Sequence, residues 1–267
     1  MIAEDSQPPA HRRQPQPGPG TTPSALRTKA LDAPSGATGQ LAGGQAADGA
    51  GGGVERTAAA LKPRMRGWLH AGVFPPALAG GIVLIAVSRS AAAVVACSVY
   101  AVSACLLFGT SAVYHRGTWG PRGEAVLRRL DHANIFLIIA GTYTPLAVLL
   151  LREDRQWVLL ALVWAGALAG IAFRMLWIGA PRWLYTPCYI ALGWVAVFNL
   201  PDFAHTGGTA VVVLVIAGGL LYTAGAVVYG LKRPDPSPAW FGFHEVFHAL
   251  TIAAFTAQYT AILLAAT

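Results

Sequence analysis

The chain has 267 residues, of which 55% are hydrophobic and only 12% are charged. A soluble globular domain carries roughly a quarter charged residues, so this composition excludes the ordinary soluble classes and predicts an all-α membrane protein. Lys and Arg outnumber Asp and Glu by 19 to 12, but the basic residues lie between apolar runs. There they act as topology signals and do not indicate a nucleic-acid partner.

Residues 1–60 are rich in Pro, Gly, Ala and Gln and show no hydrophobic periodicity. Such a segment cannot bury enough apolar surface to offset its ordering entropy, so we predict a disordered cytoplasmic tail. It lacks a basic stretch followed by an apolar one, so we do not expect a signal peptide. The predicted domains are therefore this tail over 1–60 and a membrane domain over 61–267.

From Trp68 onward, seven apolar runs are long enough to cross the ~30 Å hydrocarbon core as helices. They cover residues 69–88, 91–114, 131–151, 156–178, 183–200, 209–231 and 241–265. The connections on one side hold twelve Lys and Arg residues, and those on the other side hold three, namely Arg89, Arg152 and Arg155. Because basic residues favour the cytoplasmic side, we expect a multi-pass protein of the plasma (bacterial inner) membrane with a cytoplasmic N-terminus and an external C-terminus.

The start of the last run carries the sequence His244-Glu-Val-Phe-His248. Two His residues four positions apart project from one helix face, where two neutral imidazoles can bind one metal ion. In the expected topology, His115 at the end of the second run lies at the same cytoplasmic depth. Three such imidazoles would repel one another if charged and lose hydration if neutral, and a metal ion removes both costs. We therefore predict a metal site.

Three neutral imidazoles with no thiolate in reach leave one open position and fit a catalytic Zn²⁺. Asp131 is then a candidate to bind and deprotonate a catalytic water, although it could instead be a helix N-cap or a partner of a nearby arginine. Ser111, one helical turn from His115, could support a developing oxyanion or simply hydrogen-bond its own helix. His70 and His132 are candidates for an outer shell only, and each alone is better explained as an interface residue.

The pattern His-Glu-x-x-His also allows a membrane zinc peptidase in which Glu245 is the general base. The 19 residues after His248 contain no His, Asp, Glu or Cys, so a third ligand downstream, as many such peptidases have, is impossible. We rank this interpretation lower. The sequence leaves open whether Glu245 faces the metal or a neighbouring helix.

Several motifs in this chain resemble the bacterial hemolysin III family, which is related to the progestin and adipoQ receptors, including the adiponectin receptors, and to the alkaline ceramidases. The motifs are Arg66-Gly-Trp-Leu-His70, Ser111-x-x-Tyr-His115, Leu130-Asp-His132 with Gly141-Thr-Tyr-Thr-Pro145, and Phe243-His-Glu-Val-Phe-His248. The resemblance covers about residues 62–265. It implies a seven-helix bundle with a zinc site near the cytoplasmic face, held by His115, His244 and His248. It also implies a water-holding Asp131 and a supporting Ser111.

Two classes of function are compatible with these features. The first is a zinc-dependent hydrolase of a membrane lipid, ceramide-like or fatty-acid-like, that cleaves an amide or ester bond; the relatives suggest the amide and a role in lipid homeostasis. The second is non-enzymatic, either a receptor or regulator of membrane composition or an oligomeric cytolysin, with zinc in a structural role. The outer halves of the runs are almost wholly apolar, which disfavours a channel made by one chain. The sequence leaves the oligomeric state open.

Overall fold

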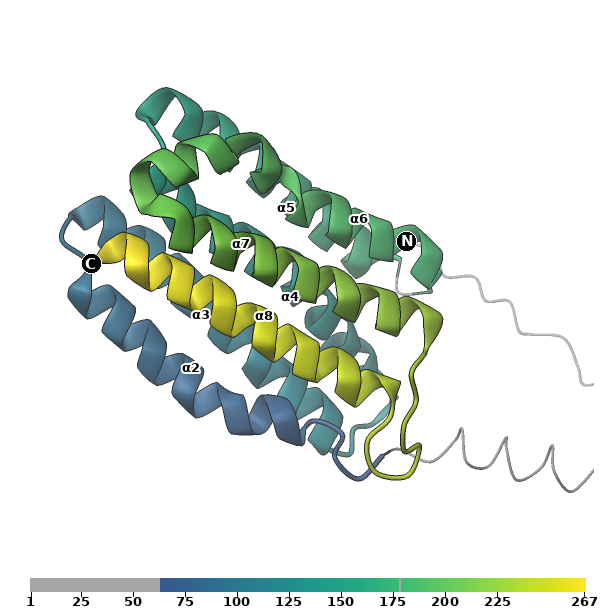
Figure 1. The fold of residues 1–267 in the computed structure, drawn as a ribbon. Coiled ribbons are helices and arrows are strands. Elements are labelled where there is room, and N and C mark those ends of the chain that lie inside the picture. The colour runs from purple at the N-terminus through teal and green to yellow at the C-terminus, as the bar shows by residue number, and fades with distance from the viewer. Residues whose placement is uncertain (1–62, 178) are drawn as a thin grey trace, which may run out of the picture. The chain divides into compact units, whose positions relative to one another are not determined.

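The computed structural model describes residues 63–177 and 179–267, and this part of the chain is built from helices (Figure 1). They are α2 (Trp68–Val87), α3 (Ala91–Arg116), α4 (Pro121–Leu150), α5 (Glu153–Leu176), α6 (Arg182–Gly193), the 3-10 helix η1 (Val195–Asn199), α7 (Leu200–Leu231) and α8 (Phe243–Ala266). The all-α class is confirmed. The prediction for residues 1–60 lies outside the described residues.

Four helices, α2, α3, α5 and α8, match predicted runs within a few residues at each end. Helix α4 differs from its predicted run. It begins at Pro121, ten residues before the predicted run 131–151. Pro121 occupies the first turn, where its missing N–H costs nothing and its fixed φ suits a helix. The segment around Arg128 is therefore helical, and Arg128 lies one turn before His132.

Six helical stretches in the described residues are long and apolar enough to span a membrane, where the sequence predicts seven. The predicted runs 183–200 and 209–231 fall into one stretch, Arg182–Leu231. Within it, α6 is short, η1 comes next, and α7 is interrupted at Gly208 (φ 79°, ψ 175°), a conformation that only glycine adopts readily. The stretch folds back on itself: Arg182 Nη1 donates to the Tyr229 carbonyl at 3.4 Å, and α6 runs beside α7 (Figure 1).

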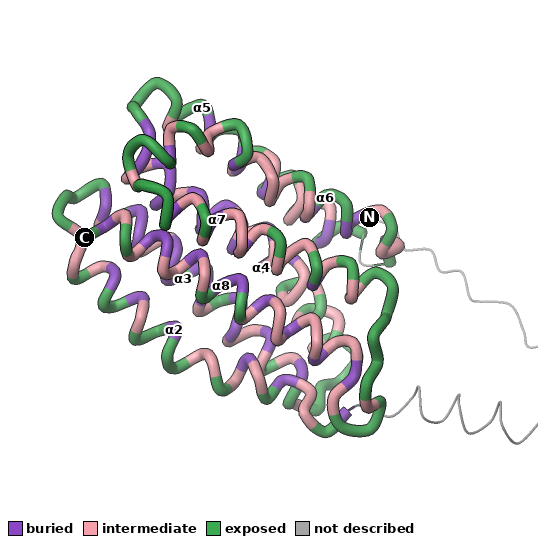
Figure 2. The backbone as a smooth tube through the Cα atoms, viewed as in Figure 1, coloured by how far each residue is buried: buried purple, intermediate pink, exposed green. Residues whose placement is uncertain are grey.

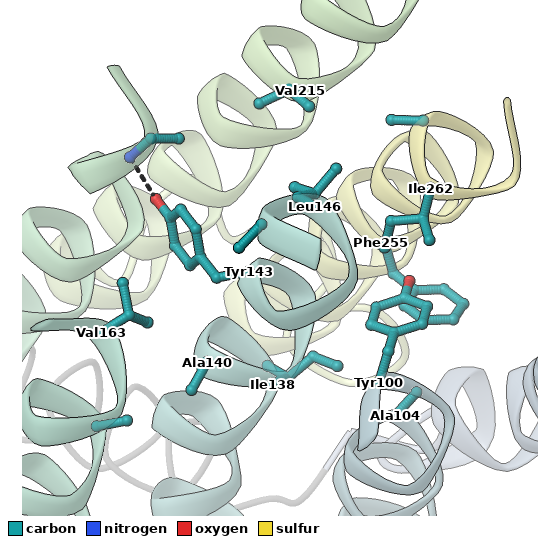
Figure 3. Close-up of a cluster of buried hydrophobic side chains, with 14 of the residues drawn as sticks. Tyr100, Ala104, Ile138, Ala140, Tyr143, Leu146, Val163, Val215, Phe255 and Ile262 are labelled. Carbon is teal, nitrogen blue, oxygen red and sulfur yellow. Dashed lines mark hydrogen bonds between the residues drawn. The ribbon is translucent and has the colours of Figure 1, made fainter. Parts of the chain in front are cut away.

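The irregular backbone between α6 and α7 has its own polar partner. The hydroxyl of Tyr143, on α4, donates to the Gly193 carbonyl at 2.6 Å. It also accepts from the Ala196 amide at 2.7 Å, the bond drawn as a dashed line in Figure 3. Backbone groups released from a helix inside a membrane must find such a partner, because no water is available there. Tyr143 therefore stabilises the break in the helix.

Helix α4 occupies the centre of the bundle. In the most apolar 18-residue stretch of α4, 72% of the residues are buried, whereas the corresponding share is 22% in α2 and in α5. Buried residues line the inner helix faces (Figure 2), while large side chains such as Ile82, Val95 and Val158 point outward, as lipid-facing residues do. Together with the six candidate spans, this pattern identifies an all-α, multi-pass membrane protein.

One end of the bundle collects the functional candidates, and we call it the His end. Here α3 ends and α2, α4 and α8 begin. On α8, which contacts α2 and α7 (Figure 1), His244 and His248 occupy the first turns. The last residues of α3 bring His115 to the same end.

Close helix packing depends on small residues, and Gly141 on α4 is the sharpest example. A Cβ at this position would lie 2.9 Å from the Cβ of Ser103 on α3. Small residues at such contacts let membrane helices approach closely. The α3–α4 contact in turn sets the distance between His115 and Asp131.

We expect Gly141→Ala to lower the midpoint of thermal unfolding in detergent, because an added methyl in a full interface typically costs about 1–3 kcal/mol. Gly72→Ala is the matched control, since its Cβ would meet nothing within 4 Å. It should leave the midpoint unchanged or raise it slightly. Equal midpoints for the two variants would contradict the packing described for α3 and α4.

Candidate metal centre

Three histidines from two helices converge at the His end. The ligand nitrogens of His115, His244 and His248 all lie within 4.8 Å of one another. Nε2 of His115 and Nε2 of His244 are 3.2 Å apart. His115 and His248 are buried and His244 is half-buried. Such a set of neutral nitrogens can hold a metal ion.

Asp131 lies beside this cluster. Its Oδ2 is 3.7 Å from Nε2 of His115 and 3.9 Å from Nδ1 of His132. It is not the N-cap of α4, which starts at Pro121, and it carries no arginine partner among the described residues. Its carboxylate is thus left facing the histidines.

Ser111 is buried on α3, one turn before His115. Its hydroxyl lies near the Asp131 carboxyl, and in the described part of the chain it makes no hydrogen bond of standard geometry. The expected alternative, a bond to a carbonyl of its own helix, is therefore absent from these residues. The hydroxyl is available to a ligand that enters beside Asp131.

The two remaining histidines have different surroundings. The ring of His70 stacks on that of His248, with centroids 3.7 Å apart and planes 10° from parallel, so His70 supports a cluster histidine from behind. His132 lies 2.7 Å from the Arg128 carbonyl through Nδ1 and 3.1 Å from the Tyr229 hydroxyl through Nε2. Because a carbonyl only accepts, Nδ1 donates and Nε2 of the neutral ring accepts from Tyr229. His132 is thus a structural link next to Asp131.

Glu245 faces away from the cluster. Its Oε1 pairs with Nε of Arg66, and its Oε2 accepts from the amide of the N-cap residue Gly242 at 2.9 Å at the start of α8. The question that the sequence leaves open is answered: Glu245 faces a neighbouring segment.

The Arg66–Glu245 pair is part of a larger contact that we call the clasp, formed by residues 63–66 and 239–245. The Arg64 amide donates to the Ala239 carbonyl at 3.0 Å, and the Met65 amide donates to the Trp240 carbonyl at 3.1 Å. The Arg64 guanidinium also lies 4.6 Å from the centre of the Trp240 ring. The clasp fixes the first turn of α8 and with it the two histidines. Sequence reasoning missed it, because the two segments lie far apart in the chain and their pairing has no local sequence signal.

Two spaces open beside the cluster. The apolar cavity is lined mainly by side chains of α3, α4, α6, α7 and α8 and includes Ser111 and His248. The basic pocket has a volume of about 400 Å³, and His115 and His244 line it together with four arginines, namely Arg66, Arg128, Arg174 and Arg182. Asp131 and Tyr229 line both spaces. The histidine cluster therefore lies where the two spaces meet.

Unsatisfied polar groups concentrate on these spaces. Eight described residues have a buried side-chain nitrogen or oxygen without a hydrogen-bond partner, and all except Tyr100 line the apolar cavity or the basic pocket. Buried polar groups normally find partners. Their distribution indicates a region built to contact a ligand. The sequence analysis did not single out Tyr229 or Arg174, and only the fold brings them to this place.

The comparisons with known proteins agree with the motifs. Residues 58–259 match the family model described as "Haemolysin-III related". Hemolysin-3 of Bacillus cereus is 37% identical over 155 residues, which cover 58% of this chain and 70% of that protein. The Hemolysin-3 homolog of Bacillus subtilis (strain 168) is 32% identical over 170 residues, which cover 63% of this chain and 79% of that protein. The resemblance seen in the motifs is confirmed, and the chain belongs to the hemolysin III family.

Proposed function

We propose that this protein is a zinc-dependent hydrolase that cleaves an amide or ester bond in a membrane lipid. The observation that carries the proposal is the position of the histidine cluster and Asp131 at the junction of an apolar cavity and a polar pocket. A lipid has the same division between an apolar chain and a polar head. Its carbonyl lies at the boundary.

Zinc fits the donor set better than other common metals. The three donors are imidazole nitrogens, no thiolate joins the cluster within the described ranges, and His248 Nδ1 is buried there without a partner. Three imidazoles leave one coordination position open, as in catalytic zinc sites. Hard cations such as Mg²⁺ and Ca²⁺ prefer oxygen ligands. Zinc supplies a Lewis acid that polarises a carbonyl and makes water more acidic.

The chain's own residues supply the proton transfers and the charge stabilisation. The Asp131 carboxylate can orient the attacking water, accept its proton and later return that proton to the leaving group. The Ser111 hydroxyl can donate to the carbonyl oxygen as negative charge develops there. His70 supports His248 by stacking, and His132, which is hydrogen-bonded to Tyr229, lies next to Asp131.

The apolar cavity is suited to a lipid chain. It reaches from Asp131 to Leu146, which are fifteen residues apart on α4, roughly 22 Å at the rise of a helix. Mostly apolar side chains line this length, including Ile135, Ile138 and Ile139. The volume of the cavity is about 130 Å³, so it would hold part of a ceramide-like or fatty-acid-like chain, with the rest of the chain outside the cavity.

We also propose that the bundle crosses the inner membrane seven times, with the His end and the N-terminus in the cytoplasm and the C-terminus outside. The segments 182–207 and 209–231, on either side of Gly208, are roughly 39 and 35 Å long at 1.5 Å per residue, and each exceeds the ~30 Å hydrocarbon core. The contact of Arg182 with Tyr229 supports two crossings in opposite directions. The excess of basic residues at the His end supports the orientation.

Two other functions compete with this one. In a zinc peptidase, Glu245 would act on water at the metal, but both of its oxygens are engaged in the clasp. The Bacillus relatives are named hemolysins, which favours an oligomeric cytolysin. A regulator of membrane composition with structural zinc is the other non-enzymatic alternative. A cytolysin would still lyse membranes after the Asp131 carboxylate is removed, whereas a hydrolase that uses this carboxylate would lose its activity.

The metal proposal predicts about one zinc ion per chain in purified protein. His248→Ala should lose most of this zinc, because it removes one of three ligands. His205→Ala is the matched control, since His205 is exposed on α7 and lies outside the cluster. Zinc content is measured by mass spectrometry of the metal, and equal zinc in both variants would exclude this site.

The hydrolase proposal predicts that wild-type protein in detergent releases fatty acid from a lipid extract. Asp131→Asn should lower the rate by about 100-fold or more, since general acid–base catalysis typically contributes 10²–10⁴-fold. Asp154→Asn, at an exposed carboxylate in the first turn of α5, should keep the wild-type rate. Zinc content should be equal in all three proteins. If Asp131→Asn turned over as fast as wild type, the proposed mechanism would fail.

The clasp predicts a shared effect for two residues. Arg66→Gln and Glu245→Gln should each lower thermal stability, because breaking a buried ion pair typically costs about 3–5 kcal/mol. Each should keep more than a tenth of the hydrolytic rate per bound zinc. A general base at Glu245 would instead make Glu245→Gln at least ~100-fold slower while Arg66→Gln stayed active. That pattern would favour the peptidase.

A further inference from the structure

Arg174 is a buried arginine without an ionic partner in the part of the chain that the structure describes. It lies in the last turn of α5 and is 2% exposed. Its Nε and Nη1 are buried and make no hydrogen bond to any described residue. The guanidinium carbon lies 4.3 Å from the centre of the Tyr185 ring, which covers one face of the group. Burying a charge without compensating hydrogen bonds is costly, so the open N–H groups call for an anion.

The usual explanation for arginine at the end of a membrane helix does not apply to Arg174. Such side chains normally extend to the membrane surface and keep the charged group in water. The neighbouring Leu176 and Trp177 do point outward, being 87% and 52% exposed, whereas Arg174 points inward and lines the basic pocket. Its charge is directed at the space beside Asp131 and His115.

The charges of the basic pocket do not balance. Arg66 is neutralised by Glu245 in the clasp. Arg128, Arg174 and Arg182 make no ion pair with any carboxylate in the described ranges, and Asp131 is the one acidic residue that lines the pocket. Three positive charges against one negative charge leave an excess of two. A phosphate monoester carries about −1.5 to −2 charges at neutral pH and accepts several hydrogen bonds.

Aromatic residues hold the arginines in position for such a group. The Arg182 guanidinium lies 4.5 Å from the centre of the Tyr229 ring, as that of Arg174 does over Tyr185. The two tyrosine hydroxyls are 3.3 Å apart, and Tyr229 also bonds to His132. Stacking leaves the Nε and Nη1 edge of Arg174 open, whereas Nη1 of Arg182 already donates to the Tyr229 carbonyl. An open guanidinium edge binds phosphate in a bidentate manner.

We propose that the basic pocket binds the phosphate of a phosphorylated lipid whose chain occupies the apolar cavity. This inference deepens the proposed function by naming its substrate class, and it rests on that function only for the chemistry that occurs after binding. Both spaces share Asp131 and Tyr229. One molecule can therefore extend from Arg174 past the histidine cluster and along α4. Binding of the phosphate fixes how far the lipid chain extends into the apolar cavity, so the carbonyl of the lipid lies at the histidine cluster.

Binding of phosphate can be tested separately from turnover. The full chain in neutral detergent is titrated with dodecyl phosphate, dodecanol and inorganic phosphate, and complexes are counted by native mass spectrometry. Dodecyl phosphate should bind at least tenfold more tightly than either of the other two, because it alone fills both spaces. Inorganic phosphate binding as tightly as dodecyl phosphate would reveal a site for free phosphate and overturn the lipid assignment. Equal binding of dodecanol and dodecyl phosphate would overturn the phosphate assignment.

Matched variants locate the site. Arg174→Met keeps an unbranched chain in place of the aliphatic part of the arginine and removes the charged guanidinium, and it should weaken dodecyl phosphate binding at least tenfold. Arg182→Gln, at a partly exposed residue of the pocket, should weaken it severalfold and serves if Arg174→Met fails to fold. Arg122→Gln is the control at an exposed arginine of α4 outside the pocket and should bind as wild type does. Equal binding by the Arg182→Gln or Arg174→Met protein and by wild type would overturn the inference.

Two further readouts separate this inference from its rivals. Without ligand, Arg174→Met should unfold at a higher temperature than wild type, since replacing an unpaired buried charge by an apolar side chain is stabilising; a lower temperature would assign Arg174 a structural role and overturn the inference. Asp131→Asn should still bind dodecyl phosphate, because it removes the one negative charge of the pocket. If phosphate binds but no lipid is cleaved by wild type, the inference stands and the hydrolase proposal fails.

Discussion

Inside a membrane, a polar side chain must find its partner within the protein, and this constraint shapes the whole His end of the bundle. Tyr143 caps the broken backbone before α7, Tyr229 holds His132, and Glu245 ties the start of α8 to Arg66. Where partners are missing, the open groups face the apolar cavity or the basic pocket, with Tyr100 as the exception in the described residues. Most polar groups in this region have partners that stabilise the fold, and the exceptions lie where we propose that a ligand binds.

The fold and the site depend on each other through a few contacts between distant segments. The clasp joins residues 179 positions apart and sets the first turn of α8, from which His244 and His248 project. The α3–α4 contact at Ser103 and Gly141 brings His115 within 3.7 Å of Asp131. Because α4 is the most enclosed helix, the Asp131 carboxylate is held by its surroundings without an arginine partner. That leaves its oxygens available for chemistry at the cluster.

Hydropathy and spacing predicted the helical class, most helix positions and the convergence of the three histidines, because each depends on a local pattern or on depth in the membrane. Three features could not be predicted in this way. The early start of α4 depends on a loop proline acting as a helix start. The helical conformation of residues 200–207 was missed, because Asp202 and His205 interrupt the apolar pattern and hydropathy therefore assigned this segment to a loop before Gly208. The partners of Glu245 and the burial of Arg174 depend on contacts between distant segments, and no local sequence pattern indicates such contacts.

The central claim is that His115, His244 and His248 together bind one zinc ion at the meeting point of the two spaces. X-ray absorption at the zinc edge of the purified full chain tests this claim most directly. We expect three imidazole nitrogens at about 2.0–2.1 Å, one oxygen ligand and no sulfur, with one imidazole lost in the His115→Ala protein. A first shell that contains sulfur, or one that stays unchanged in His115→Ala, would contradict it.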